Sequence, residues 1–241
     1  MSGDGLSGDG GTTTVPEGTS RIRVLLVDDQ PLFRAGVRML VGSQPDLEFV
    51  GEAANGAEGV QLARETAPDV VLMDIRMPVM DGIAATTAII ESAAREARNA
   101  PRIVVLTTFD LDEAAARAIR GGASGFVLKD AEPEFLLAAI RTVHAGSAVI
   151  AAGATRELFQ FFSSSEPVKP EPEEFGSLTA REKEIFVLAA RGLSNSEIAA
   201  AEYLSEATVK THISRILSKL GLRDRVQMVV YAFEHGLTSA E

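Results

Sequence analysis

Between residues 21 and 146, short apolar runs alternate with segments whose apolar residues recur at helical spacing. Ile22–Val27 is an uninterrupted apolar run, which is typical of a strand buried on both faces of a sheet. In residues 31–43 apolar residues recur three or four positions apart, and Pro31 suits the first turn of a helix. The alternation continues with strands predicted at 47–53, 70–73, 103–106 and 125–128, and helices at 57–66, 83–96, 112–119 and 133–145.

Five strands alternating with five helices predict an α/β domain over residues 21–146. We expect a doubly wound, flavodoxin-like, five-stranded parallel sheet with helices on both faces. Residues 1–20 are rich in glycine, serine and threonine and lack apolar periodicity, so we expect a disordered tail there. Residues 147–177 begin as a possible helix and continue as a linker rich in proline, serine and glutamate.

Residues 178–241 predict a second domain, small and all-α. Four helical segments have clear ends, because Thr179 with Glu182 and Ser194 with Glu197 fit capping boxes. Ser205 and Asp224 are placed to cap the third and fourth helices. Glycines stand where three of these helices should stop, at positions 192, 221 and 236.

The net charge of −11 argues against nucleic-acid binding until it is divided along the chain. Residues 178–241 carry eight basic and eight acidic residues, so this part is neutral. Within residues 206–225, five basic residues stand against only two acidic ones. Local charge matters more than total charge for contacts with phosphates, so the second domain remains a candidate for nucleic-acid binding.

Composition excludes several other classes of function. The chain has no cysteine, which excludes disulfides, thiolate zinc sites and cysteine nucleophiles. Three histidines leave little room for a histidine metal site or a catalytic triad. The sequence has no apolar run long enough to span a membrane, and its start does not resemble a secretory signal. We therefore expect a cytoplasmic protein.

Polar side chains gather at the predicted carboxyl ends of the strands, where open α/β sheets place their sites. Asp28 and Asp29 follow the first strand, Asp74 the third, Thr107 the fourth and Lys129 the fifth. Clustered carboxylates suit Mg²⁺, and a metal beside a carboxylate and a lysine is a phosphoryl-transfer arrangement. A single aspartate here is usually a turn or cap residue, but caps alone hardly explain the whole set.

The segments VLLVDDQPLFRAGV, DVVLMDIRMPVMDGI, IVVLTTFD and GASGFVLKD resemble the receiver domain of bacterial two-component response regulators. The resemblance implies that Asp74 accepts a phosphoryl group from a sensor histidine kinase. It implies that Asp28, Asp29 and Asp74, with the backbone carbonyl of Arg76, hold Mg²⁺. It further implies that Lys129 contacts the phosphoryl oxygens. The implied switch residues are Thr107 and Phe126.

The predicted helix over residues 206–220 has an apolar face and an opposite polar face. Small hydroxyl residues and the bases Lys210 and Arg215 share the polar face, which has no acid at its centre. Such a face can enter a DNA groove closely while its bases reach phosphates or base edges. Composition alone equally allows an ordinary solvated helix face.

The segments LTAREKE, GLSNSEIA and SEATVKTHISRILSKL resemble the LuxR-type helix-turn-helix of the NarL/FixJ class. The resemblance implies that residues 206–220 are the recognition helix, lying in the major groove of double-stranded DNA. The implied base contacts are Lys210, Thr211 and Ser214. The implied phosphate contacts are Thr208, Arg215 and Lys219. The last helix, at 224–235, is implied to help form a homodimer.

These features together predict a transcription regulator gated by phosphorylation and not an enzyme. A phosphatase using Asp74 as nucleophile is disfavoured, because such enzymes commonly carry a second acid two residues on, where this chain has Arg76. A vestigial receiver that acts without phosphorylation is disfavoured because the acidic pair, Asp74 and Lys129 are all present.

Overall fold

The computed structural model describes residues 20–108, 113–146 and 172–237. The first domain is a parallel sheet of five strands in the order β2-β1-β3-β4-β5, as the alternating pattern predicts. The strands are β1 (Ile22–Val27), β2 (Leu47–Ala53), β3 (Val70–Asp74), β4 (Arg102–Thr107) and β5 (Gly125–Leu128). The helices are α1 (Pro31–Gly42), α2 (Gly56–Thr66), α3 (Gly82–Arg95), α4 (Glu113–Arg120) and α5 (Pro133–His144).

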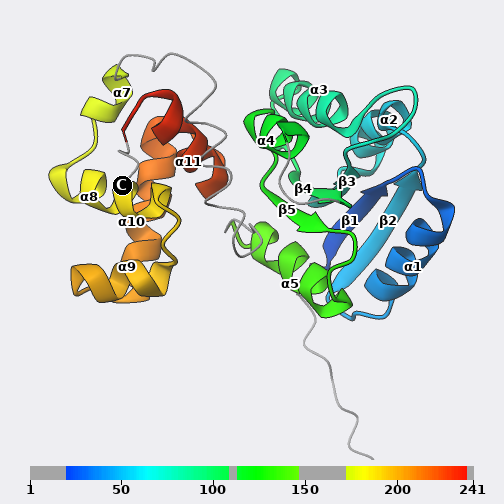
Figure 1. The fold of residues 1–241 in the computed structure, drawn as a ribbon, viewed down its shortest axis with the longest axis horizontal. Helices are drawn as coiled ribbons and strands as arrows, with labels where there is room; N and C mark the ends of the chain where they lie inside the picture. The colour runs from blue at the N-terminus through cyan, green and yellow to red at the C-terminus, as the bar shows by residue number, and fades with distance from the viewer. Residues whose placement is uncertain (1–19, 109–112, 147–171, 238–241) are drawn as a thin grey trace, which may run out of the picture.

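The strands supply side chains to both faces of the sheet, which is why the inner strands β1, β3 and β4 are mostly apolar, whereas the edge strand β2 also carries exposed or half-buried glutamates. In β1, Val24 and Leu26 pack on the side of α1 and α5, whereas Leu25 and Val27 pack on the side of α2 and α3. Figure 1 shows the sheet between these helices. This double burial holds the carboxyl ends of the strands, and the polar residues that follow them, along one edge of the sheet.

The second domain is a helical bundle with its own apolar core. Its helices are α8 (Ala180–Ala190), α9 (Asn195–Glu202), α10 (Glu206–Leu220) and α11 (Arg225–Glu234). Both predicted capping boxes are present, and the side chains of Ser205 and Asp224 cap α10 and α11. The predicted stop glycines all have positive φ angles, the conformation that a glycine adopts most readily.

One short helix lies in the stretch that the sequence assigns to the linker. α7 (Glu173–Gly176) places the buried side chain of Phe175 in the second core, edge-on to Phe186 with ring centroids 5.1 Å apart. The packed part of the second domain therefore begins before residue 178. The rest of the predicted linker and the N-terminal tail lie outside the described residues, except for the few positions nearest the domains.

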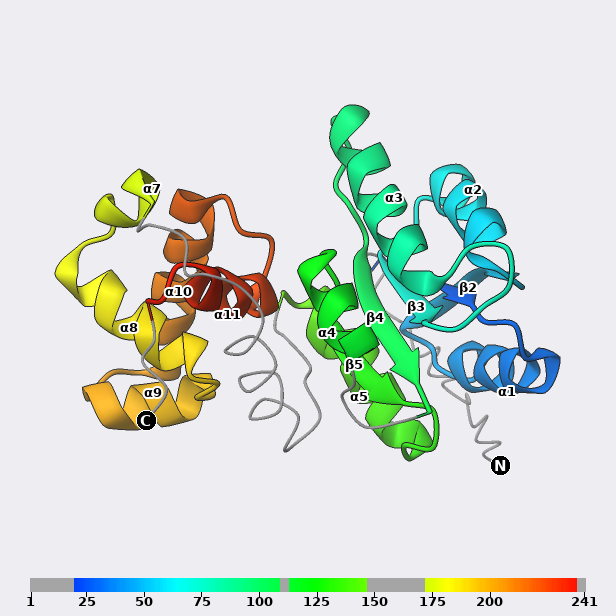
Figure 2. The same ribbon diagram turned by 45° about the horizontal axis from the view of Figure 1, so that its top comes forward.

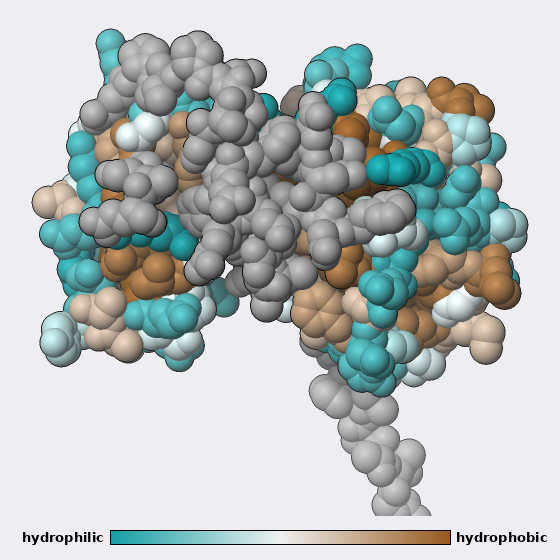
Figure 3. All heavy atoms as spheres, viewed as in Figure 1, coloured by the Kyte–Doolittle hydropathy of each residue, from teal (hydrophilic) through white to brown (hydrophobic). Residues whose placement is uncertain are grey.

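The surfaces of both domains carry hydrophilic and hydrophobic residues together. Figure 3 shows hydrophilic and hydrophobic side chains interspersed over the visible described residues. Within the three ranges that the structure describes, no helix combines the length and the apolar character needed to cross a membrane.

Candidate functional site

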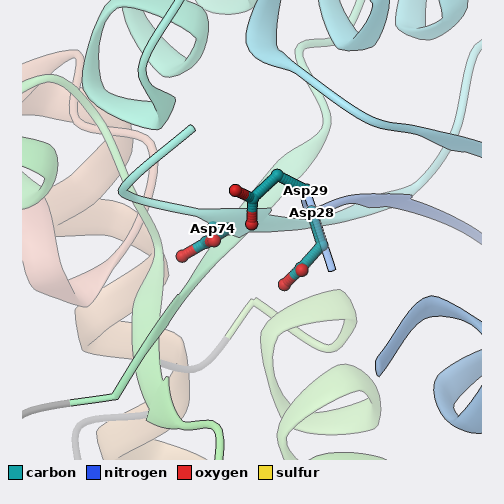
Figure 4. Close-up of side chains that lie close together, drawn as sticks. All are labelled: Asp28, Asp29 and Asp74. Atoms are coloured by element: carbon teal, nitrogen blue, oxygen red, sulfur yellow. The ribbon is translucent and has the colours of Figure 1, made fainter. Parts of the chain in front are cut away.

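Three carboxylates meet at the carboxyl edge of the sheet. Asp28 and Asp29 follow β1, and Asp74 is the last residue of β3, the strand beside it (Figure 4). Asp28 and Asp74 are buried, whereas Asp29 is exposed. One carboxylate oxygen from each residue lies within 4.8 Å of the others. This concentration of negative charge requires a cation, since like charges at this distance repel one another strongly.

Lys129, directly after β5, supplies one such cation. Its Nζ lies 2.8 Å from Oδ2 of Asp74 and 2.8 Å from Oδ2 of Asp28. It also lies 5.2 Å from the centre of the Phe33 ring, at the distance of a cation–π contact. Burial lowers the pKa of Lys129, but hydrogen bonds to the two aspartates outweigh it and raise that pKa overall, so the ammonium is charged at neutral pH.

Asp74 is held in the environment of a reactive carboxylate. Burial raises its pKa above the usual value, and the charge of Asp28 adds to this effect. The hydrogen bond from Lys129 and one from the backbone of Arg76 act in the opposite direction. Burial removes water from the carboxylate, and the lysine lies where an incoming anionic group needs a positive charge.

The two predicted switch residues, Thr107 and Phe126, lie on β4 and β5, the next two strands of the sheet after β3. Thr107 is the buried last residue of β4, and its carbonyl accepts a 2.7 Å hydrogen bond from the backbone of Lys129. Phe126 is fully buried in β5, in an apolar cluster that also contains Ile75, next to Asp74.

Sequence reasoning missed Gly82, the first residue of α3. A Cβ at this position would lie 1.9 Å from the carbonyl oxygen of Asp74, so only glycine lets the start of α3 approach the end of β3. Asp81 caps the same helix by accepting a 2.8 Å hydrogen bond from the backbone of Ala84, as its place in the turn suggests. The MDG triplet thus shapes the loop beside Asp74.

The predicted DNA-contacting residues all lie exposed on α10. They are Thr208, Lys210, Thr211, Ser214, Arg215 and Lys219. The opposite face of α10, formed by Val209, Ile213, Ile216 and Leu220, is buried in the second core. The helix therefore presents a polar face of small residues and bases to its surroundings, which the groove of a duplex can accommodate.

The side chain of Lys219 is held by a carboxylate on another helix, whereas the hydroxyls of Thr208 and Thr211 bond to residues of α10 or its cap. Its Nζ lies 2.7 Å from the carboxylate of Glu182 and 3.3 Å from the carbonyl oxygen of Ser177. The same carboxylate accepts a 2.8 Å hydrogen bond from the backbone of Thr179. These bonds lower the pKa of Glu182 from 4.5 to about 2, the contact with Lys219 contributing most. Lys219 therefore ties α10 to the start of α8.

This contact predicts a stability difference that depends on pH. A carboxyl whose pKa is lowered by folding stabilises the fold above its unfolded pKa and loses that effect as pH falls towards its folded pKa. We expect the Glu182→Gln variant to be less stable than the wild-type chain at pH 6, by about 1 kcal/mol. The difference should shrink as pH falls from 4.5 towards 2, the two ends of the Glu182 shift.

Urea unfolding of both chains at a series of pH values measures this difference. The Glu184→Gln variant is the matched control, because Glu184 is an exposed member of the same helix paired with Arg181. A Glu182→Gln variant whose destabilisation stays constant over this pH range would contradict the prediction.

Glu202, at the end of α9, has a clear structural partner. Arg181 on α8 donates to both the side chain and the backbone carbonyl of Glu202, the latter at 2.9 Å. Glu202 therefore joins α8 to α9, the helix that precedes α10.

Both domains match known families. Residues 24–141 match the family described as response regulator receiver domain, and residues 176–232 match bacterial regulatory proteins of the luxR family. This chain belongs to the LuxR-type response regulators. The resemblances stated from the motifs are thereby confirmed, and the family is one of transcription regulators and not of enzymes.

Curated relatives resemble this response regulator along most of their length. The transcriptional regulatory protein YxjL of Bacillus subtilis is 41% identical over 218 residues, which cover 90% of this chain and 97% of YxjL. The response regulator VraR of Staphylococcus aureus is 38% identical over 216 residues, covering 90% of this chain and 98% of VraR.

Solved structures agree with the fold. A two-component response regulator of the LuxR family from Aurantimonas is 35% identical, with a TM-score of 0.53, over 59% of this chain and 98% of that chain. RcsB of Salmonella typhimurium is 22% identical, with a TM-score of 0.52, over 88% of this chain and 97% of RcsB. At that identity RcsB supports the fold alone.

Proposed function

We propose that phosphorylation of Asp74 by a sensor histidine kinase controls this response regulator. Phosphorylation would gate its dimerisation and its sequence-specific binding to DNA. The observation that carries the proposal is the bridge formed by Lys129, whose Nζ lies 2.8 Å from both Asp74 and Asp28. A buried carboxylate, a neighbouring cation and further carboxylates form a site that can accept a phosphoryl group.

The proposed reaction begins with attack by a carboxylate oxygen of Asp74 on the phosphorus of the donor. The bond from phosphorus to the donor atom breaks as the new P–O bond forms, and an acyl phosphate results. Lys129 would turn from Asp74 to an oxygen of the bound phosphoryl group. Thr107, at the end of β4, would donate its hydroxyl to another, and Phe126 would move with it.

The donor set at this site fits Mg²⁺. Three carboxylate oxygens within 4.8 Å of one another carry more negative charge than Lys129 alone offsets. Asp28, Asp29 and Asp74, with the carbonyl oxygen of Arg76, would hold the ion, because hard cations prefer oxygen ligands. When bound, Mg²⁺ supplies neutralising charge to the phosphoryl oxygens.

The second domain would carry the output by inserting α10 into the major groove of DNA. Lys210, Thr211 and Ser214 would contact bases, and Thr208, Arg215 and Lys219 would contact phosphates. RcsB has been solved as two dimers bound to two parallel DNAs. The homodimer that the motifs of this chain imply would bind DNA, and these partners imply a cytoplasmic location.

The proposal is tested by phosphorylating the purified full chain with acetyl phosphate and Mg²⁺. The DNA for the binding assay is obtained first, by selecting from a random pool the duplexes that the phosphorylated chain binds. We expect tighter binding to these duplexes, and a larger mass by light scattering, after phosphorylation. A chain that takes up no acid-stable, base-labile phosphoryl group would refute the proposal, as would a phosphorylated chain with unchanged DNA affinity.

Lys210→Ala should weaken binding to the selected duplex by about 1–3 kcal/mol, because a lysine that reads a base edge contributes to one sequence only. Binding to random duplexes should change less. Lys219→Ala should instead lower affinity for all sequences alike and reduce the salt dependence. Equal effects of the two substitutions on selected and random duplexes would contradict this division of roles.

A further inference from the structure

Lys129 has a third neighbour besides Asp28 and Asp74, the aromatic ring of Phe33. Nζ of Lys129 lies 5.2 Å from the centre of this ring, and only 6% of the lysine side chain is exposed. Two of the three N–H groups of the ammonium bond to the aspartates, each at 2.8 Å. Among the described residues, no third acceptor forms a hydrogen bond to Nζ, so the ring face supplies its next electrostatic contact.

The first turn of α1 is fixed in the position that brings Phe33 to the lysine. Oδ1 of Asp28 accepts a 2.9 Å hydrogen bond from the backbone of Gln30, while Oδ2 lies against Lys129. Arg34 donates to the carbonyl oxygen of Asp28 at 2.8 Å. In Figure 2, α1 and α5 lie on the same side of the sheet, and Lys129 stands between β5 and α5 in the chain. Asp28 therefore aligns both the ring and the ammonium that faces it.

The surroundings of this contact are mostly apolar. A cavity of about 500 Å³ lies beside Phe33 and Lys129, with Leu128 and Leu136 in its wall. Among the described residues that line it, only Gln30 and Lys129 are polar. A cation is attracted to a ring face more strongly where water is scarce, because its charge is less screened there. The nearly buried ammonium is therefore placed for an effective cation–π contact.

Phosphoryl transfer requires Lys129 to change its partner. In the structure Nζ binds the nucleophilic carboxylate of Asp74, and in the proposed reaction it turns to an oxygen of the phosphoryl group. A hydrogen bond to a carboxylate is directional, whereas a ring face attracts a cation anywhere within about 6 Å of its centre. The ring of Phe33 can thus keep the ammonium beside the acceptor while its contact with Asp74 is broken.

We propose that Phe33 is a positioning residue for phosphoryl transfer, whose ring face keeps the ammonium of Lys129 beside Asp74. The inference rests on the proposed function, in which Asp74 is the acceptor. Without the ring, the two carboxylates alone would direct the ammonium. A smaller fraction of molecules would then have it placed for the incoming phosphoryl group, and the rate of phosphorylation falls with that fraction.

The first test compares the full-length wild-type chain with Phe33→Leu, which removes the ring and keeps an apolar side chain. Phe49→Leu is the matched control, because Phe49 packs against the same apolar core from β2, at the opposite edge of the sheet from β5. The initial rate of phosphorylation by acetyl phosphate is measured in Mg²⁺. So small a donor avoids the contacts that a protein donor would make with the surface around Phe33.

We expect Phe33→Leu to be phosphorylated about threefold more slowly than the wild type, which corresponds to a cation–π contact of ordinary strength. Phe49→Leu should match the wild type.

A second series separates the charge distribution of the ring from its size. Phenylalanine analogues with two or three ring fluorines are introduced at Phe33 of the full chain by suppression of a stop codon. Fluorine withdraws electrons from the ring face and weakens its attraction for a cation, while the ring changes little in size. We expect the rate of phosphorylation to fall stepwise as fluorines are added. These chains keep the ring, so they report on the contact even where Phe33→Leu is less stable.

The contact is also measured by NMR without Mg²⁺ or a phosphodonor. Nuclei above the face of an aromatic ring resonate upfield, so the Hε protons of Lys129 should lie upfield in the wild-type chain. Their signal, assigned by its loss in Lys129→Arg, should move downfield in Phe33→Leu and stay in place in Phe49→Leu. This shift reports where the end of the lysine side chain lies and does not depend on phosphorylation.

The outcomes separate the inference from the function on which it rests. A rate that Phe33→Leu leaves unchanged, or one that does not follow the number of fluorines, would overturn the positioning role and leave the function standing. An unchanged Lys129 signal in Phe33→Leu would overturn it as well. Absence of phosphorylation in every chain, the wild type included, would instead refute the role of Asp74.

Discussion

Replacement of Asp74 by asparagine is expected to abolish phosphorylation while leaving the fold intact. The neutral amide cannot act as the nucleophile, so no acyl phosphate can form. The substitution also removes one of three clustered carboxylates, two of which are buried. We therefore expect the melting temperature without Mg²⁺ to hold or to rise. Labelling with acetyl phosphate and thermal unfolding measure the two effects.

Asp81→Asn is the matched control, because Asp81 lies in the same loop but only caps α3. It should be phosphorylated like the wild type, since asparagine is as good a cap as aspartate. An Asp74→Asn chain that still takes up one stoichiometric phosphoryl group would show that the acceptor lies elsewhere.

Lys129→Ala is expected to destabilise the metal-free chain by about 3 kcal/mol, because it removes the partner of a buried ionic group. Asp28 is fully buried, and Asp74 is 5% exposed. Without the ammonium, these two carboxylates face each other and the exposed Asp29. Addition of Mg²⁺ should recover much of the lost stability, since a divalent cation can replace the missing charge.

Urea unfolding in EDTA and in Mg²⁺ measures both parts of this prediction. Lys183→Ala is a suitable control, because Lys183 lies 4.8 Å from the ring of Phe175 on the second domain, away from the carboxylates. Equal stability of Lys129→Ala and wild type in EDTA would mean that the carboxylates do not depend on this lysine. Stability that Mg²⁺ does not restore would argue against an ion at this site.

Most helices and strands could be predicted because the local sequence pattern favours the same element that packing in the fold requires. The inner strands are mostly apolar since helices cover both faces of the sheet, and the helices of the second domain begin with capping side chains. α7 could not be predicted this way. It is four residues long within a segment rich in proline and glutamate, and tertiary contacts, chiefly the packing of Phe175 in the second core, stabilise it.

The cluster of Asp28, Asp29, Asp74 and Lys129 could be predicted largely because these residues all lie at or just after the carboxyl ends of strands of one parallel sheet. In a parallel sheet, residues that follow neighbouring strands meet at the same edge, so Asp28 and Asp74 had to be close. Lys129 follows β5, which β4 separates from β3, and its long side chain reaches both carboxylates along the same edge.

The partners of individual side chains could not be predicted. The contact between Lys219 and Glu182 joins residues 37 positions apart. Each residue has a role without this contact, since Glu182 belongs to a capping box and Lys219 is an implied phosphate contact, so the sequence does not indicate that they pair.

The sequence by itself determined the fold class, the two-domain organisation and the set of groups at the acceptor edge, because these depend on periodicity and on residue type. Only the tertiary structure decided how the two domains meet. Arg102, Arg223 and Gln227 look like ordinary surface residues in the sequence, and in the structure they bind mostly to backbone carbonyls. Every residue has such a carbonyl, so these partners have no signature in the sequence and are defined only by the packed fold.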